Sequence, residues 1–424
     1  MEVLVLESLS DADRRELLRR TMPDDAEVRA RVAAILGAVR EHGDDALREF
    51  SERYDGVRLA GFRIPPEEMR RALSEISPEQ RAALETARSQ IEAFHRLQGT
   101  QGYRVEPLPG LTLGQRLRPF RRVGIYVPKN LPSTLLMASI PARIAGVREL
   151  AVCSPPQPDG SVPASIRAAA ALLEISEIYA LGGAHAIAAL AYGTSSIPAV
   201  EKIVGPGNAY VTAAKLLVRD EVGIDLLAGP SEVLLLVESI PGLSETTLAE
   251  WALAELVAQL EHGPGTSALL LTNLPNLARN VAAALSSTQP ADRHVAVLSY
   301  TVRNRAVDFI NQYAPEHLGL WVEDAERVLD SIENAGSVFL GPWSPVALGD
   351  YASGPNHILP TAGTARFQGG LTVESFQKRV QFQRATPAAL HALAPAAVAI
   401  AHMEGMTAHA ASLNLRLKGG PHEK

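Results

Sequence analysis

Four short groups of residues in this chain carry side chains that can move protons or bind metal ions. Glu316 and His317 are adjacent, within the segment Ala-Pro-Glu-His-Leu at 314–318. A carboxylate beside an imidazole offers two proton acceptors of different basicity, which suits a reaction with two proton-transfer steps. An ordinary Glu–His pair on the surface, where a strand begins, is the alternative. The pair alone therefore leaves both interpretations open.

Candidate metal ligands lie in separate segments. Gln259 and His262 are three residues apart in a helical pattern, so their side chains share one face. Asp350 lies seven residues before His357 in a glycine-flanked segment, where capping of a helix would explain the aspartate equally well. Such nitrogen and oxygen donors suit Zn²⁺ or a similar divalent ion.

The remaining pair lies near the C-terminus. Glu404 and His409 are five residues apart in a helical pattern, which does not place them cleanly on one face. Spacing alone does not unite them with the other groups. The only cysteine, Cys153, excludes an internal disulfide and a thiolate metal cage, and it suits a reducing cytosol.

The elements that must position these residues follow the pattern of a parallel α/β protein. From Arg122 onward, short β-rich runs alternate with helical patterns, which predicts parallel sheets covered on both faces. Strands are expected at 123–127, 150–154, 177–181, 202–204, 233–237, 268–272 and 295–299, and helices at 133–145, 163–173, 245–261 and 277–285. The turn 205–208 opens another helix, to about 218, where backbone amides can receive an anion, but it lacks the third glycine of the dinucleotide fingerprint.

Helical patterns flank these α/β units as an N-terminal helical arm, 11–100, and a C-terminal helical tail, 387–417. Between them, residues 341–370 are rich in Gly, Pro, Ser and Asn, and we expect a long ordered loop that carries a site. The expected domains are 1–24, 25–122 together with 236–372, 123–235, and 373–424.

The composition limits the class of partner. A chain of 424 residues, 46% of them hydrophobic, can build two or three domains with cores of their own. The net charge of -7 provides no basic field for nucleic acid or for an anionic membrane, so we expect a small-molecule partner. The acidic first residues and the lack of a long apolar run predict a cytoplasmic protein without an export signal or membrane span.

Six segments, taken in order, resemble the histidinol dehydrogenase family. They are 204–211, 223–233, 259–262, 314–318, 349–361 and 404–409, and the resemblance spans nearly the whole chain. It implies two incomplete Rossmann-like sheets. It also implies a zinc-assisted, NAD-dependent oxidation of L-histidinol through L-histidinaldehyde to L-histidine, the last step of histidine biosynthesis.

The resemblance assigns a role to each group of residues. His317 would be the base for the alcohol proton, and Glu316 would activate water to hydrate the aldehyde. One Zn²⁺ per subunit would be held by Gln259, His262, Asp350 and His409. The substrate positions would be Ser231, Gln259, His262, His317, Asp350, His357, Glu404 and His409, and the NAD positions Tyr126, His185 and Asn208. In this family the dimer is intertwined, so Glu404 and His409 would act in the partner subunit's site.

The chain departs from the family pattern in three segments. Lys129 and Asn130 replace two glycines in a shortened loop after the first α/β strand, and His185 stands where the family has Gln. Val346 stands where the family tends to carry Glu. The two larger changes fall on the NAD side, where Lys129 is a candidate partner for the pyrophosphate.

Three alternatives stay open. An enzyme on the same scaffold would oxidise another amino or polar alcohol, which retention of Ser231, His357 and Glu404 disfavours. A non-redox module would bind metal and imidazole with an altered NAD site, although it need not keep a base such as His317. A metallohydrolase would need only the metal and Glu316, and activity without NAD would identify it.

Overall fold

The computed structural model describes residues 1–20, 26–99, 101–227, 229–286 and 293–419. The expected boundary at residues 24 and 25, Ala228 in the 223–233 segment, and the last residues of the expected tail lie outside the described residues. Two units divide the chain: Met1–Gln98 with Phe120–Phe376, and Gly99–Pro119 with Gln377–Lys424. No helix within the described ranges is long and apolar enough to cross a bilayer.

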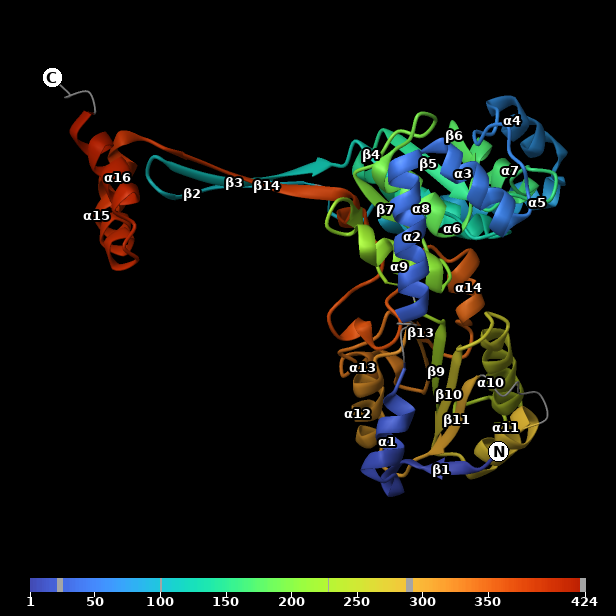
Figure 1. The fold of residues 1–424 in the computed structure, drawn as a ribbon. Helices are drawn as coiled ribbons and strands as arrows, with labels where there is room; N and C mark the ends of the chain where they lie inside the picture. The colour runs from blue at the N-terminus through green and yellow to red at the C-terminus, as the bar shows by residue number, and fades with distance from the viewer. Residues whose placement is uncertain (21–25, 100, 228, 287–292, 420–424) are drawn as a thin grey trace. The chain divides into compact units, whose positions relative to one another are not determined.

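The first unit contains a six-stranded sheet in which every pairing is parallel (Figure 1). Its strands, in spatial order, are β1 (Val3–Val5), β11 (His294–Ser299), β10 (Ser267–Thr272), β9 (Glu232–Val237), β12 (His317–Trp321) and β13 (Ser337–Leu340). Central strand β9 has the sequence EVLLLV and is buried along its whole length. Such continuous apolar runs are typical of parallel strands that are covered on both faces.

Helices cover both faces of this sheet. Val233 and Leu235 of β9 face one hydrophobic core, and Leu234 and Leu236 face another, as the two-residue period of a strand requires. The first core includes residues of α10 (Glu245–Leu260) and α11 (Pro275–Ser286). The second includes residues of α1 (Asp11–Leu18), α12 (Arg303–Tyr313) and α13 (Ala325–Leu329).

A second parallel sheet in the same unit has five strands. In spatial order they are β6 (Glu177–Ala180), β5 (Glu149–Ser154), β4 (Arg122–Tyr126), β7 (Lys202–Val204) and β8 (Gly223–Ile224). The helices between them are α6 (Pro132–Ala145), α7 (Ala164–Leu172), α8 (Gly183–Tyr192) and α9 (Ala209–Val218). The α/β class, the parallel sheets and the helical terminal parts are therefore confirmed.

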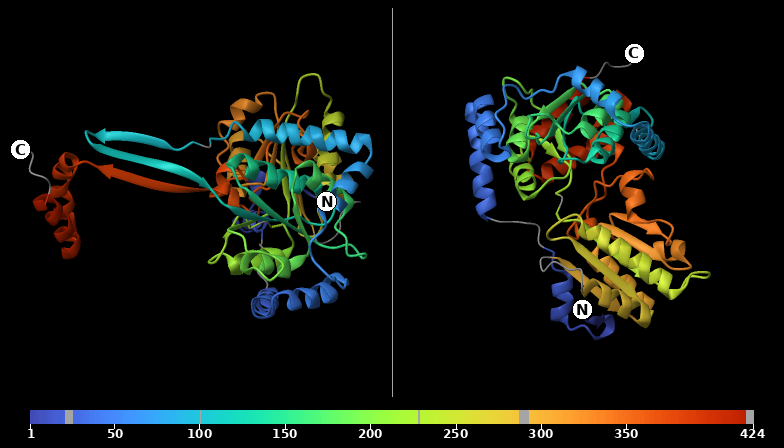
Figure 2. Two further views of the ribbon diagram at one scale, coloured as in Figure 1. Left: turned by 90° about the horizontal axis from the view of Figure 1, so that it is seen from above. Right: turned by 90° about the vertical axis from the view of Figure 1, so that its right-hand side faces the viewer.

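The N-terminal helices share a core with the five-stranded sheet. They are α2 (Ala26–His42), α3 (Asp44–Phe50), the π-helical turn η2 (Ser51–Asp55), α4 (Pro66–Glu75) and α5 (Pro78–His95). Helix α2 lies beside α8 and α9 (Figure 2). This differs from the expected grouping of 25–122 with 236–372. The buried faces of α2 and α5 join the core of strands β4 to β7, whereas residues 3–18 join the six-stranded sheet.

The second unit is an antiparallel sheet followed by two helices. Strand β3 (Leu111–Pro119) pairs with both β2 (Tyr103–Leu108) and β14 (Gln377–Ala385). The helices are α15 (Pro387–Met403) and α16 (Thr407–Gly419). The single helical tail expected over 387–417 is thus broken, because Gly405 adopts the left-handed conformation, at φ 71°, that ends helices.

The Gly205–Asn208 turn connects β7 to α9 and depends on a glycine. Gly205 has φ 115°, and a Cβ at this position would lie 2.1 Å from the carbonyl oxygen of Tyr126. Residues with a side chain rarely adopt this conformation, and the neighbouring atom is main chain, which cannot move aside. The turn therefore requires Gly205.

We expect Gly205→Ala to lower the free energy of unfolding by about 2 kcal/mol or more, from backbone strain combined with the clash. Gly37→Ala is the matched control, because Gly37 lies in helix α2 and a Cβ there would meet nothing within 4 Å. Alanine there should raise stability by about 0.5–1 kcal/mol. Denaturant unfolding of both variants checks this, and equal stability of the two would contradict it.

Candidate active site

A cavity of about 580 Å³ in the first unit brings together residues from distant parts of the chain. The polar and charged residues in its lining include Ser133, Thr134, Asn208, Thr212, Ser231, His262, Glu316, His317, Asp350, His357 and Thr361. Both sheets contribute to it. Pro128 and Asn208 follow the C-terminal ends of β4 and β7, whereas Ser231 and His317 lie at the N-terminal ends of β9 and β12.

Glu316 is buried at the wall of this cavity, only 6% exposed, which excludes an ordinary surface pair with His317. Its Oε2 accepts hydrogen bonds from the Ser231 hydroxyl at 2.6 Å and from the Glu232 backbone N–H at 2.8 Å. Burial raises the pKa of Glu316, while the neighbouring His317 and these two donors oppose the rise. The carboxyl group is therefore fixed in position and readily takes up a proton.

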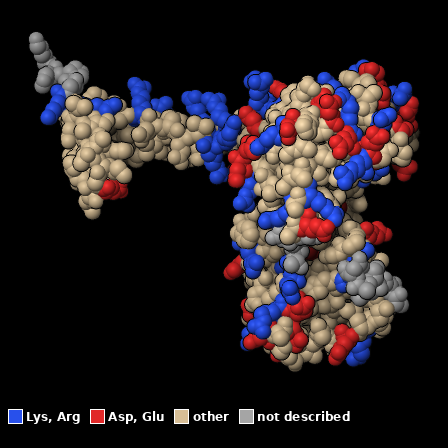
Figure 3. Space-filling view, in the orientation of Figure 1, with Lys and Arg blue, Asp and Glu red and all other residues tan. Residues whose placement is uncertain are grey.

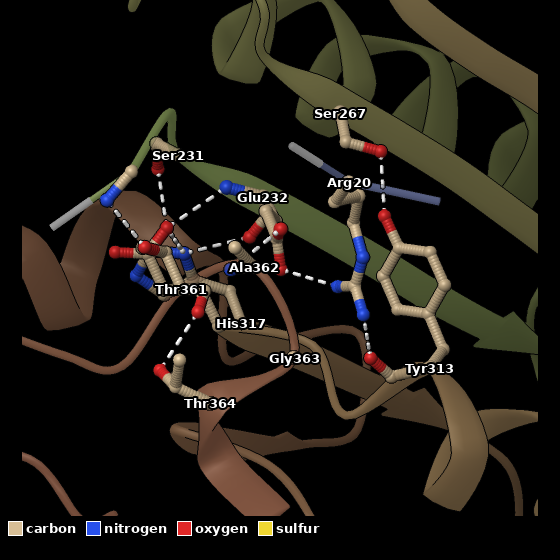
Figure 4. A network of polar contacts seen from close by, with 12 residues as sticks. Arg20, Ser231, Glu232, Ser267, Tyr313, His317, Thr361, Ala362, Gly363 and Thr364 are labelled. Carbon is tan, nitrogen blue, oxygen red and sulfur yellow. Dashed lines mark hydrogen bonds and ion pairs between the residues drawn. The ribbon is translucent and has the colours of Figure 1, made fainter. Parts of the chain in front are cut away.

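His317 is buried beside Glu316, and a backbone carbonyl group determines which of its ring nitrogens carries the hydrogen. Its Nδ1 lies 3.0 Å from the carbonyl oxygen of Glu232 (Figure 4), and a carbonyl only accepts, so Nδ1 carries the hydrogen. In the neutral ring Nε2 therefore has the lone pair, and it lies 3.6 Å from Asp350 Oδ1. Burial lowers the pKa of His317, but Glu316 and Asp350 outweigh this effect and raise it to about 9.

Two further imidazoles show the same arrangement. His262 Nδ1 lies 3.3 Å from the carbonyl oxygen of Gln259, and His357 Nδ1 lies 2.8 Å from that of Asp350. Each ring therefore donates through Nδ1 and keeps Nε2 as an acceptor. Histidines that bind metals are usually held by such a hydrogen bond from the other ring nitrogen.

The first unit supplies an incomplete set of metal donors. Asp350 and His262 line the cavity, and the Gln259 side chain is buried with its Nε2 unpartnered among the described residues. Asp350 lies in the last turn of α14 (Val346–Tyr351), whose first residue follows Pro345, so it does not cap the start of this helix. Helix α14 also interrupts the long loop expected over 341–370. Within the described ranges, no three His, Cys, Asp or Glu residues converge as a metal site.

The expected NAD positions differ in how they meet the cavity. Asn208 lines it and caps α9, because its Oδ1 accepts from the N–H groups of Tyr210 and Val211. Tyr126 is buried, and its hydroxyl accepts from Gly183 N–H at 3.1 Å. His185 is buried, with Nε2 3.4 Å from Asp55 Oδ2. Neither Tyr126 nor His185 belongs to the cavity lining in the described chain.

The altered loop after β4 keeps a glycine-like backbone. Asn130 has φ 65°, the left-handed region that glycine favours and that asparagine tolerates better than most residues. Lys129 is exposed, and its neighbour Pro128 lines the cavity. Val346, the third departure, is buried, and its N–H donates to Glu255.

Glu404 and His409 belong to the second unit. Glu404 follows the last residue of α15, and His409 lies in the first turn of α16. Both are exposed.

Sequence reasoning missed two groups that hold the cavity wall. Glu232 lies beside Ser231 and has no role in the family resemblance, yet its backbone bonds both Glu316 and His317. Lys215 is buried and donates to Asp225 and to the carbonyl oxygens of Gly205 and Leu226. A lysine inside an apolar helical pattern was the available signal for the second group, since buried lysines need partners.

Two parallel α/β sheets around one polar cavity define an α/β enzyme fold. The family model described as histidinol dehydrogenase matches residues 18–417. The histidinol dehydrogenase of Methanothermobacter thermautotrophicus is 45% identical over 417 residues, which cover 95% of this chain and 96% of that protein. The histidinol dehydrogenase of Xanthomonas euvesicatoria pv. vesicatoria is 41% identical, with 98% and 99% covered.

The fold agrees with these similarities. The crystal structure of histidinol dehydrogenase from Elizabethkingia anophelis superposes with a TM-score of 0.90 at 33% identity, covering 97% of this chain and 96% of that one. The chain belongs to the histidinol dehydrogenase family, a family of oxidoreductases.

We expect Asp225→Asn to lower the free energy of unfolding by about 3 kcal/mol, because it leaves the Lys215 cation buried without a counter-charge. The two side chains are only 1% and 3% exposed. Asp220→Asn is the control, since Asp220 is 93% exposed beside Arg219 and should leave unfolding unchanged. Denaturant unfolding checks the pair, and a neutral Asp225→Asn would contradict a role for this ion pair in the wall.

Proposed function

We propose that this protein oxidises L-histidinol to L-histidine in two NAD-dependent steps, assisted by a zinc ion. The observation that carries the proposal is the buried pair Glu316 and His317, both hydrogen-bonded to the backbone of Glu232. The pair lines the same cavity as His262, Asp350 and His357. Membership of the family supports the substrate, which carries an alcohol, an amine and an imidazole.

His317 would act as the base in the first oxidation. A carbon gives up hydride readily only as its oxygen loses a proton, so a proton acceptor must contact that oxygen. In the neutral ring Nε2 is the acceptor nitrogen, because Nδ1 donates to the Glu232 carbonyl oxygen. The same hydrogen bond fixes the ring orientation and would hold Nε2 toward the alcohol.

Glu316 would act in the second oxidation, when the aldehyde adds water. Its carboxylate would take a proton from that water, giving the hydrate whose carbon can lose hydride again. Ser231 and the Glu232 N–H, both on Oε2, would orient the carboxylate and leave Oε1 for the water. Two oxidations thus have two bases that lie next to each other.

Gln259, His262 and Asp350 would hold the zinc ion from the first unit. The buried side chain of Gln259, whose Nε2 has no hydrogen-bond partner among the described residues, and the acceptor nitrogen Nε2 of His262 fit such a role. When bound, the metal would supply a fixed positive charge that orients the amine and imidazole of the substrate. Zinc favours four ligands, and this unit offers three side chains, so the set is completed by His409 in our proposal.

NAD would accept the hydride in each oxidation. The cavity reaches Pro128 and Asn208 beyond the C-terminal ends of β4 and β7. Open α/β sheets bind dinucleotides at this edge, and the Gly205–Asn208 turn brings main chain and a helix start to it. Asn208 would therefore contact the cofactor more directly than the buried Tyr126 and His185.

We expect about two NADH formed per L-histidinol consumed by zinc-loaded protein, because each oxidation delivers one hydride to a nicotinamide cofactor. Absorbance of NADH and quantification of L-histidine measure the ratio. Folded, metal-loaded protein that forms no NADH would contradict the proposal, and turnover without NAD would indicate a metallohydrolase.

The separate roles of His317 in the first oxidation and Glu316 in the second can be tested with single variants. His317→Ala should suppress the first oxidation, whereas Glu316→Gln should spare it and block conversion of L-histidinaldehyde. Glu326→Gln, an exposed residue of α13, is the matched control and should behave as wild type. Wild-type turnover of the aldehyde by Glu316→Gln would remove the role of Glu316.

We further propose a homodimer in which the partner subunit supplies His409 and Glu404. The second unit contains nine Lys and Arg residues and three Asp and Glu residues, so it is basic. The first unit contains 31 Lys and Arg residues and 44 Asp and Glu residues, so it is acidic. Figure 3 shows the basic side chains over the strands of the second unit, which include Arg116, Arg118 and Lys378. The same unit exposes apolar side chains, among them Ile400 at 55% and Met403 at 86%. A basic, apolar surface on one copy complements an acidic unit of another.

Mixing the His409→Ala and His317→Ala variants should restore activity. Each mixed dimer would hold one intact site, so random exchange should restore about a quarter of the wild-type activity. Mixing His317→Ala with Asp350→Ala is the control, because both changes fall in the first unit and no mixed dimer has an intact site. No recovery after verified exchange would contradict the shared site.

A further inference from the structure

Arg20 connects the N-terminal segment to the residues that hold the two bases. It lies two residues after α1, and its side chain is 9% exposed. One guanidinium nitrogen donates to Glu232 Oε2 at 2.6 Å, and another donates to the carbonyl oxygen of Tyr313 (Figure 4). The guanidinium also lies 3.6 Å from the centre of the Tyr313 ring, and the Tyr313 hydroxyl is held by Ser267 at 2.6 Å.

One partner of Arg20 contacts the two bases in space, and the other precedes them on the chain. Glu232 begins β9 and bonds Glu316 and His317 through its own N–H and C=O. Tyr313 ends α12, three residues before Glu316, and Ala314 between them has φ 51°. Arg20 therefore joins the strand that holds the bases to the turn that carries them.

Among the described residues, the second oxygen of the Glu232 carboxylate has a backbone group as its hydrogen-bond partner. Glu232 Oε1 accepts from the Ala362 N–H at 2.9 Å. Burial raises the pKa of Glu232 to about 7, and the Arg20 charge opposes that rise. Without Arg20, a buried carboxylate close to Glu316 would lose its counter-charge and either move or take up a proton.

We infer that Arg20 is a positioning residue for Glu316 and His317, acting through Glu232 and the Tyr313 carbonyl. This inference rests on the proposed function for its catalytic consequence. Small displacements of reacting groups are costly, since a shift of about 1 Å can lower the rate a hundredfold. The NAD side is independent, because Asn208 is held by α9.

The first test compares Arg20→Met with Arg14→Met. Arg14 lies on α1 and contacts the same helix α12 through Gln312 and the Phe309 ring, without a described contact to Glu232. Arg20→Met should lower kcat at least tenfold, by about the effect of a misplaced base, with KM for NAD unchanged. Arg14→Met should keep the wild-type kcat. A wild-type kcat in folded Arg20→Met would overturn the inference.

A second comparison separates positioning from general stability. Arg20→Met should lower kcat much less in a Glu232→Gln background than in the wild type, because the neutral amide does not need the Arg20 cation as a counter-charge. An equal loss in both backgrounds would show that Arg20 does not act through Glu232. Should Arg20→Met not fold, Arg20→Gln takes its place, and a wild-type kcat in that variant would overturn the inference equally.

A spectroscopic measurement remains decisive even if the wild type oxidises no histidinol, which would refute the proposed function alone. In protein labelled with ¹⁵N-histidine, the buried Nδ1–H of His317, assigned by its loss in His317→Ala, should give a solvent-protected signal. Arg20→Met should shift or broaden this signal, and Arg14→Met should leave it unchanged. An unchanged signal in Arg20→Met would refute the positioning role.

Discussion

The backbone of a single residue at the start of a strand organises this active site. Glu232 donates its N–H to the carboxylate of Glu316 and accepts from the imidazole of His317 through its carbonyl oxygen. Main-chain groups at the first residue of a strand have fewer ladder partners than those inside it, so they are available for side chains. The parallel pairing of β9 with β12, which places His317 opposite Val233, brings Glu316 and His317 to that point.

The cavity joins opposite edges of two sheets. The five-stranded sheet contributes the C-terminal ends of its strands, where open α/β sheets usually bind cofactors. The six-stranded sheet contributes the N-terminal ends of β9 and β12. The two edges differ in what they present to the cavity. The edge of the five-stranded sheet presents loops and a helix start, and the edge of the six-stranded sheet presents the buried side chains of Glu316 and His317.

Local sequence patterns predicted the elements well, because buried parallel strands such as β9 have a continuous apolar signature. The chemistry of Glu316 and His317 also stood out, since an acid and an imidazole are adjacent. The grouping of the N-terminal helices did not follow from the sequence, because an amphipathic face such as that of α2 does not specify which sheet it covers.

Contacts between residues that are distant in the sequence also could not be predicted from local patterns. Arg20 and Glu232 form an ion pair although they are 212 positions apart, and the sequence around each residue does not indicate its partner. His185 shows the same limit, because its burial beside Asp55 depends on how η2 meets α8. By contrast, the break at Gly405 had a visible signal, since glycine is the residue that most often ends a helix.

The pairing of β1 with β11 has a consequence for the order of folding during synthesis. Val3 pairs with Val297, so the edge of the six-stranded sheet is completed only after most of the chain has been made. The five-stranded sheet and its helices lie between residues 26 and 224 and can assemble earlier, as units generally do during synthesis. Until residue 299 has left the ribosome, strand β1 would remain unpaired, and chaperones or a premature partner could capture it. Docking of β1 on β11 is therefore a late step in the assembly of this sheet.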